Sequence, residues 1–316
     1  MSLIGFAVAV ALQLAPGPEA WPGEMRDTLD ALQAVPADPA PAQVTNGVHY
    51  LTSNERRLDL FLPELSHRGG VHLGVGSDQN YILAGWSRPE LMVVVDFDQS
   101  VVDMHTIYGS LFASAETPQR FVELWSEDGS ADAKQAIRDA VPRGLKRKRL
   151  VDLYTQARRD VAKRTKVLLR KYDDLGVHWY LEDQAQYDAV RTLAVGGKVI
   201  AVRGDFTVEG VLQDVGELLH DADRPVHTLY LSNIEQYFMY TKTYRANMLG
   251  LPFDDKTLVL RTLPGRPAGF QYMLQQGENF RAWLQAKRVY SVYRVRGMVK
   301  GEHLEASEKF IIDELP

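Results

Sequence analysis

Apolar and polar positions first form a regular pattern between residues 71 and 96. Residues 71–75 and 91–96 are nearly continuous apolar runs, which is typical of strands covered on both faces in a parallel sheet. Residues 80–88 between them predict a crossover helix that ends before Pro89, since proline cannot continue a helix. This strand–helix–strand pattern predicts a parallel α/β unit.

Later apolar runs extend the predicted sheet. They cover residues 198–202, 226–231 and 257–263. Residues 270–287 have the spacing of an amphipathic helix. Residues 289–296 and 309–314 alternate apolar with polar positions around a turn at Gly301, which predicts an antiparallel hairpin at the sheet's edge. The predicted fold is α/β, a Rossmann-like, mostly parallel sheet of the class I methyltransferase type with a C-terminal antiparallel hairpin.

Residues 100–195 have apolar spacings of three and four and predict a large helical insertion, because one crossover needs far fewer residues. Within residues 143–171, twelve Lys and Arg accompany two Asp. Such a run is typical of one solvated helix face, and the alternative is a patch for an acidic partner or membrane surface. A short helix is predicted over residues 58–65, and residues 52–55 (Thr-Ser-Asn-Glu) have the composition of its cap.

The N-terminal residues predict a different kind of segment. Residues 3–15 form a 13-residue apolar run that is too short to span a bilayer but has the length of a signal-peptide core. Small residues follow at Ala15 and Ala20, although the first basic residue is Arg26. We predict a signal-like or hydrophobic segment over 1–20, a Pro/Ala-rich linker over 21–43 and one domain over 44–316. Export or a membrane-proximal location is favoured. A helix packed on the domain, a misassigned start codon and a cytoplasmic location are the alternatives.

Composition excludes several classes of chemistry. The chain has 316 residues, no cysteine and a formal net charge of -5. Disulfides, thiolate metal sites and cysteine nucleophiles are therefore excluded, and general affinity for nucleic acid is not expected. The histidines are scattered without ligand spacing, so no metal site is predicted. His72 lies within a predicted buried strand and is interpreted as a core histidine.

The most informative motif is the glycine turn within residues 69–80. Asp96 follows Gly76 by 20 residues, where nucleotide-binding α/β domains place the carboxylate that binds a ribose. A dinucleotide fingerprint requires a third glycine at position 79, and this chain has Gln79. The pattern therefore favours an adenosine moiety without a pyrophosphate, as in S-adenosylmethionine, over NAD. The alternative is that both glycines serve tight packing alone.

Polar residues follow four predicted strands, at the ends where open parallel sheets bind ligands. Together with the neighbouring glycines they are Gly74, Gly76, Asp78, Gln79 and Asn80 after the first, Asp96 and Asp98 after the second, Gly204 and Asp205 after the third, and Ser232, Asn233, Glu235 and Tyr237 after the fourth.

These residues suggest roles in methyl transfer. The backbone at Gly74 and Gly76 would accommodate the methionine part, Asp96 the ribose hydroxyls and Asp205 the adenine amino group. Glu235 would act as the base, with Asn233 and Tyr237 as positioning residues.

Three local alternatives remain open. Asp96 would only cap the next helix, Asp205 would only form a turn, and Ser232 with Glu235 would form a capping box.

Residues 69–80, 94–96 and 230–237 together resemble an uncharacterised bacterial family with a class I methyltransferase-like fold, known mainly from a leptospiral member. Residues 52–55 are similar to that family's N-terminal Ser-Asn-Glu element, which implies that Ser53, Asn54 and Glu55 join the pocket. The family's Asp-Ile-Arg-Arg run is replaced here by Asp-Phe-Asp-Gln at residues 96–99, which argues against an anionic ligand at this position.

The leading hypothesis is an S-adenosylmethionine-binding protein and methyltransferase of unknown acceptor. The basic stretch suggests an acidic acceptor. The alternative is a non-catalytic cell-envelope binding module on the same fold, since an exported chain would have no methyl donor. An NAD-linked oxidoreductase is disfavoured by Gln79.

Overall fold

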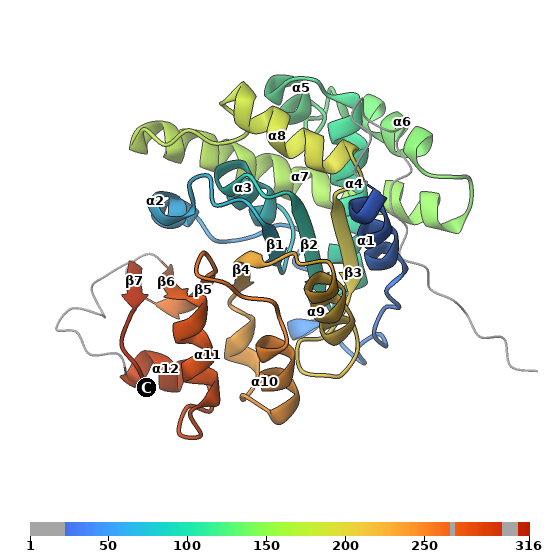
Figure 1. Cartoon of the computed structure of the whole chain (residues 1–316). Coiled ribbons are helices and arrows are strands. Elements are labelled where there is room, and N and C mark those ends of the chain that lie inside the picture. Colours follow the sequence, from blue (N-terminus) through green and yellow to red (C-terminus); the bar gives the residue numbers. More distant parts are fainter. Residues whose placement is uncertain (1–22, 266–268, 299–308) are drawn as a thin grey trace, which may run out of the picture.

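The computed structural model describes residues 23–265, 269–298 and 309–316, and these are built around a seven-stranded sheet of order β3-β2-β1-β4-β5-β6-β7 (Figure 1). The strands are β1 (Val71–Gly74), β2 (Leu91–Asp96), β3 (Val199–Arg203), β4 (Val226–Ser232), β5 (Leu258–Gly265), β6 (Gly269–Gln276) and β7 (Lys309–Ile312). Strands β1 to β5 are parallel, β6 is antiparallel to β5, and β7 is parallel to β6. The protein is therefore α/β with a mostly parallel sheet and a C-terminal antiparallel pair.

Helices cover both faces of this sheet. The α-helices are α1 (Gly23–Ala34), α2 (Leu62–Leu65), α3 (Gln79–Ser87), α4 (Gln99–Ser114), α5 (Pro118–Glu123), α6 (Ser130–Ala140), α7 (Leu145–Leu175), α8 (Gln184–Val195), α9 (Val211–Asp221), α10 (Lys242–Leu249), α11 (Gly277–Gln285) and α12 (Val292–Met298), and the 3-10 helices are η1 (Thr45–Gly47), η2 (Leu58–Phe61) and η3 (Ile234–Tyr237). Figure 1 shows α3 to α8 on one side of the sheet and α9 to α12 on the other.

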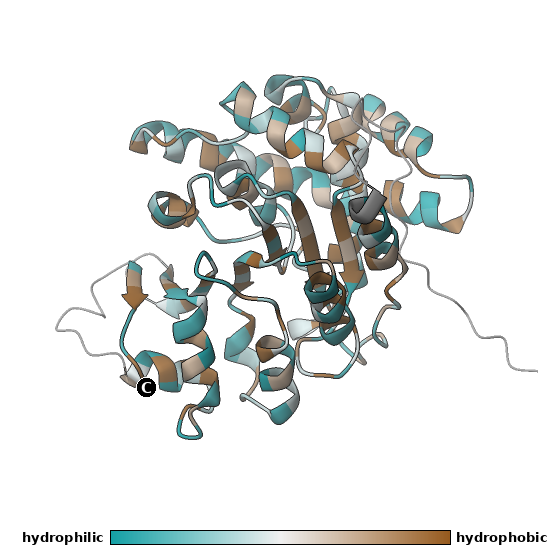
Figure 2. Ribbon diagram, in the orientation of Figure 1, coloured by the Kyte–Doolittle hydropathy of each residue, from teal (hydrophilic) through white to brown (hydrophobic). Residues whose placement is uncertain are grey.

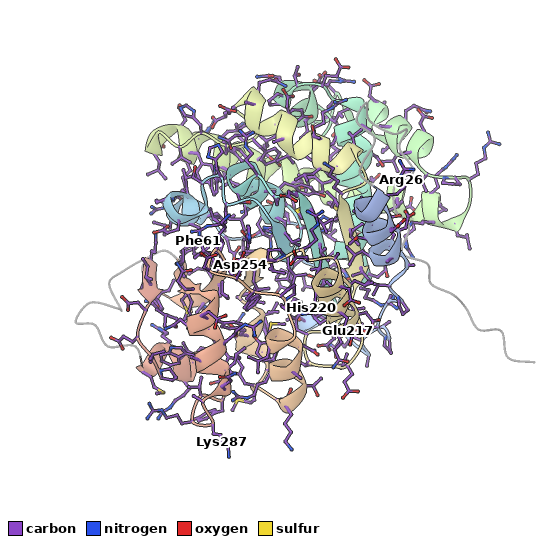
Figure 3. The ribbon with its side chains drawn as sticks, viewed as in Figure 1. Arg26, Phe61, Glu217, His220, Asp254 and Lys287 are labelled. Atoms are coloured by element: carbon purple, nitrogen blue, oxygen red, sulfur yellow. The ribbon has the colours of Figure 1, made fainter. Side chains whose placement is uncertain are left out.

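Two apolar cores lie between the sheet and these helix layers. In β2, Met92 and Val94 belong to the core under α3 to α8, whereas Val93 and Val95 belong to the core on the opposite face. Both faces of the strand are thus buried, which explains its continuous apolar sequence. Figure 2 shows the central strands as hydrophobic. Helix α9 is amphipathic: Val215 and Leu219 are buried, while Glu217 and His220, labelled in Figure 3, are exposed.

The region between β2 and β3 contains five helices, as expected for a helical insertion. Helix α7 has 31 residues and places its apolar positions on one stripe against the core. Most of its Lys and Arg residues are exposed or partly exposed, so the basic run forms mainly a solvated face. Among the described residues, no helix has the length and apolarity required to cross a membrane.

The N-terminal boundary of the folded region differs from the prediction. Residues 21–43 were expected to be a linker, but residues 23–34 form α1, and Leu32 is fully buried in the second core. Asp38 follows and accepts hydrogen bonds from the backbone of Asp205 and Val211. The folded region therefore includes residues well before 44. The predicted signal-like segment 1–20 lies outside the described residues.

The C-terminal elements were also partly mispredicted. The predicted helix 270–287 is strand β6 followed by α11, because Tyr272 and Leu274 face one core and Met273 faces the other. The predicted hairpin of residues 289–296 and 309–314 is wrong: the first part contains α12, and β7 pairs with β6. The antiparallel pair is formed by β5 and β6 instead. The expected turn at Gly301 lies outside the described residues.

Candidate functional site

A cavity of about 360 Å³ lies at the carboxyl ends of β1 to β4. Residues 45–54, which we call the strap, form one wall. Predicted site residues in the lining are Ser53, Asn54, Gly76, Gln79, Asp96, Asp98, Gly204, Asp205, Ser232, Asn233 and Tyr237. Parallel strands end at the same sheet edge, so residues far apart in sequence meet here. Four predicted residues, Gly74, Asn80, Glu55 and Glu235, do not belong to this lining.

The glycine turn after β1 is closed by Gln79. Gly76 has a φ of +86°, and a Cβ at this position would lie 2.1 Å from Gln79 Nε2. The Ser77 backbone N–H donates to Gln79 Oε1 at 3.0 Å. The Gln79 side chain therefore folds back over the turn, in space that a third glycine would leave open.

Asp96 is almost buried at the end of β2. Its carboxylate accepts hydrogen bonds from the backbone N–H groups of Gly76 at 3.1 Å and Asp98 at 2.9 Å. Burial raises the pKa of Asp96 to about 7, the Asp98 charge raises it further, and the two backbone hydrogen bonds oppose this shift. The residue that caps α4 is Asp98, which accepts from Ser100 N at 2.8 Å. The helix-cap interpretation of Asp96 is therefore incorrect.

His49, which the sequence analysis missed, contacts this part of the site. Its Nδ1 lies 2.7 Å from Asp98 Oδ2, and its side chain is 43% exposed. No spacing rule in the sequence connects residues 49 and 98, so the pair emerges only from the fold. His49 thereby ties the strap to the cavity-lining Asp98.

Asp205 combines a turn role with a place in the lining. Its Oδ1 accepts from Thr207 N at 2.8 Å and from Thr207 Oγ1 at 2.7 Å. Gly204 before it has no room for a side chain, since a Cβ would lie 2.7 Å from Val95 Cγ1. The turn interpretation and the site interpretation of Asp205 are therefore compatible.

The strap is held by a buried ion pair. Thr52 Oγ1 and Ser53 N donate to Asp78 Oδ1 at 2.9 and 2.7 Å, and the Asp78 carboxylate forms an ion pair with Arg164 of α7. Arg164 Nη1 also donates to the Glu55 carbonyl at 2.7 Å. Residues 52–55 therefore do not cap η2, whose N-cap is Arg57. A signal for Arg164 was present in the sequence, because position 164 falls on the apolar stripe of its helix.

Two carboxylates near the end of β4 have different environments. Glu55 is 1% exposed and accepts hydrogen bonds from four hydroxyl groups, those of Ser53, Tyr230, Ser232 and Thr262. Glu235 accepts from Tyr240 and Tyr244 at 2.6 and 2.7 Å and lies 3.2 Å from Arg261. Glu235 is therefore an interior group outside the cavity lining, and its placement does not support the expected role of base. The capping box does not form either, because the N-cap of η3 is Asn233 rather than Ser232 and no side chain caps this helix.

The remaining predicted residues, Gly74 and Asn80, lie next to the glycine turn and stabilise it. Asn80 Nδ2 donates to the carbonyls of Val75 and Ser77, and Asn80 Oδ1 lies 2.9 Å from His72 Nε2. A Cβ at Gly74 would lie 2.0 Å from Asn80 Oδ1. Burial lowers the pKa of His72 to about 4, as expected for a core histidine. The described residues contain no cluster of three or more possible metal ligands.

Comparison with known proteins gives a family without a known activity. A family model described as "Domain of unknown function (DUF7790)" matches residues 50–309. No curated protein matches the chain. The expected relation to the leptospiral family gains no support from these comparisons. The match covers residues 50–54 of the strap, strands β1 to β6 and the first residue of β7, and on this basis the chain belongs to the DUF7790 family.

Proposed function

We propose that the cavity binds S-adenosylmethionine and that the protein is a methyltransferase. The charge of the lining carries this proposal. Asp96, Asp98 and Asp205 line the cavity, and none of the lining residues in the described chain is Lys or Arg. S-adenosylmethionine carries a sulfonium and an ammonium group, which such a lining would attract. The phosphates of NAD or ATP would be repelled by it.

The sheet order also supports the proposal. Strand order reverses between β1 and β4, and open α/β sheets bind ligands at such a switch point, outside the carboxyl ends of the strands. The cavity has this position. We therefore propose that the fold is Rossmann-like and of the class I methyltransferase type, with the β5–β6 pair as its antiparallel part.

The lining offers a partner for each part of this cofactor. Asp96 would accept hydrogen bonds from the ribose hydroxyls, and Asp205 would accept one from the adenine amino group. The apolar Phe97 and Phe206 belong to the same lining. The turn at Gly76 would hold the methionine part. When bound, the cofactor would supply an activated methyl group, so the protein would need mainly to align the acceptor and exclude water.

Calorimetric titration of S-adenosylhomocysteine into the full chain tests this proposal. Saturable binding is expected, with weaker or absent binding of NAD and ATP. Asp96→Asn should weaken binding by about tenfold or more, since hydrogen bonds to charged groups contribute roughly 1.5–3 kcal/mol. Asp103→Asn is the matched control, because Asp103 is a buried acid of α4 outside the cavity lining.

Absence of heat with S-adenosylhomocysteine would overturn the proposal and favour the alternative of a non-catalytic binding module. Tighter binding of NAD or ATP than of S-adenosylhomocysteine would also overturn it.

A further inference from the structure

A buried carboxylate lies directly behind the cavity wall at the end of β4. Ser53 and Ser232 line the cavity, and both donate hydrogen bonds to Glu55, at 3.3 and 2.9 Å. Glu55 itself is 1% exposed and outside the lining. The two serine hydroxyls thus connect the cavity lining to this buried carboxylate.

The surroundings of Glu55 differ from those of an ordinary buried ion pair. In the described chain no basic side chain forms an ion pair with Glu55, and its four side-chain partners are hydroxyl groups. Glu235, by contrast, has Arg261 as its cationic partner. Burying a carboxylate without an ion-pair partner is unfavourable, so the four hydroxyl groups must compensate its desolvation.

The backbone holds Ser232 in a special conformation. Its φ is +47°, a left-handed value that L residues seldom adopt, and the β4–β5 register shifts between Tyr230 and Ser232. Strained backbone of this kind persists where surrounding contacts over-determine it. Here it places the Ser232 hydroxyl between Glu55 and the cavity.

We propose that the methyl acceptor is a protic nucleophile, an amine or hydroxyl compound, whose proton leaves through Ser232 to Glu55. This inference rests on the proposed function. The acceptor's lone pair forms the new bond to the methyl carbon, and the pair of the broken carbon–sulfur bond stays on sulfur. The acceptor proton passes to Ser232 Oγ as the Ser232 proton passes to Glu55 Oε1.

The test uses sinefungin, a cofactor analogue that carries an amine where the methyl group would be. Its ammonium should face Ser232 and Glu55, whereas S-adenosylhomocysteine has no group there. The full-length wild type should bind sinefungin at least about tenfold more tightly than S-adenosylhomocysteine, because the ammonium group gains one charge-assisted hydrogen bond. Glu55→Gln and Ser232→Ala should each remove most of this preference while retaining affinity for S-adenosylhomocysteine.

Glu235→Gln is the matched control, since it neutralises the other buried carboxylate near β4; because it leaves Arg261 buried without its ion-pair partner, it is used once its folding is established, and it should keep the preference. If Glu55→Gln does not fold, Ser232→Ala decides the outcome. A preference that persists in the foldable variants, or that is absent from the wild type, overturns the inference. Failure of both ligands to bind the wild type refutes the proposed function instead.

Discussion

Arg164, in the middle of the 31-residue helix α7, forms a buried ion pair with Asp78, which lies 86 residues earlier in the glycine turn. The Arg164 side chain is 8% exposed and the Asp78 side chain 10%. Asp78 in turn accepts hydrogen bonds from Thr52 and Ser53 of the strap. One guanidinium thus connects α7 of the helical insertion to the strap and to the glycine turn, both of which line the cavity.

Removing only one member of this pair should be strongly destabilising. Arg164→Met would leave the Asp78 carboxylate buried without a cation, and we expect unfolding to become easier by about 3–5 kcal/mol. Urea unfolding measures this change. Arg164→Met combined with Asp78→Asn should recover a large part of the loss, because no unpaired charge remains. Equal destabilisation in the single and double variants would contradict the explanation.

His105, which contacts the glycine turn, should make the free energy of unfolding depend on pH. His105 contacts the Gly76 carbonyl through Nε2 and the Tyr81 hydroxyl through Nδ1, both at 2.9 Å. Burial lowers its pKa to about 4 from an ordinary 6.5. Between these values the unfolded state binds the extra proton, so stability present above pH 6.5 is lost as the pH falls towards 4.

For one such group the free energy of unfolding changes by at most about 1.4 kcal/mol per pH unit. Urea unfolding from pH 7 to 4 should show a shallower loss in His105→Gln than in the wild type. His72, whose pKa is also lowered to about 4, contributes a parallel slope that this variant leaves in place. An unchanged slope in His105→Gln would contradict the assignment.

Local pattern was sufficient to predict β2, and it found β1 and β4 to within a residue or two. A strand that is buried on both faces of a sheet needs an apolar residue at nearly every position, so its sequence is easily recognised. It failed for β6, because a mostly buried strand of eight residues followed directly by a helix satisfies both a period of 2 and a period of 3.6. The linker prediction failed because it rested on the prolines that flank α1 and overlooked the apolar positions within the helix, where Leu29 and Leu32 are buried.

The strand ends were predictable as a site because parallel topology brings them together. The roles of the two glutamates were not. Glu55 and Ser232 are 177 residues apart and meet only when β4 lies beside the strap, so no sequence spacing reports their hydrogen bond. Glu235 lies three residues after Ser232, which suggested a capping box, but Arg261 and two tyrosines hold it in the interior.

Substitution of Gly76 should affect the turn through its backbone and its neighbour. Gly76→Ala introduces a Cβ where Gln79 Nε2 lies and forces a φ of +86° on a residue with a side chain. We expect a loss of stability of roughly 1–2 kcal/mol, measured by thermal unfolding. The double variant with Gln79→Ala removes the steric contact but keeps the backbone strain. It should recover only part of the loss, and full recovery would show that φ is unimportant here.

Asp96 gives the pH dependence expected of the proposed cofactor site. Its pKa is raised to about 7 by burial, so it is mostly protonated at pH 5.5 and mostly ionised at 8.5. Hydrogen bonds donated by ribose hydroxyls would favour the ionised form. Affinity for S-adenosylhomocysteine should therefore rise with pH, by up to about tenfold per unit below 7, and level off above it.

Calorimetric titrations from pH 5.5 to 8.5 would measure this profile. The buried histidines with a pKa of about 4 stay neutral over the range, so they do not contribute to it. Asp96→Asn should bind more weakly with a flat profile, because its side chain does not ionise. The same slope in Asp96→Asn as in the wild type would assign the titration to another group and remove Asp96 from the ribose site.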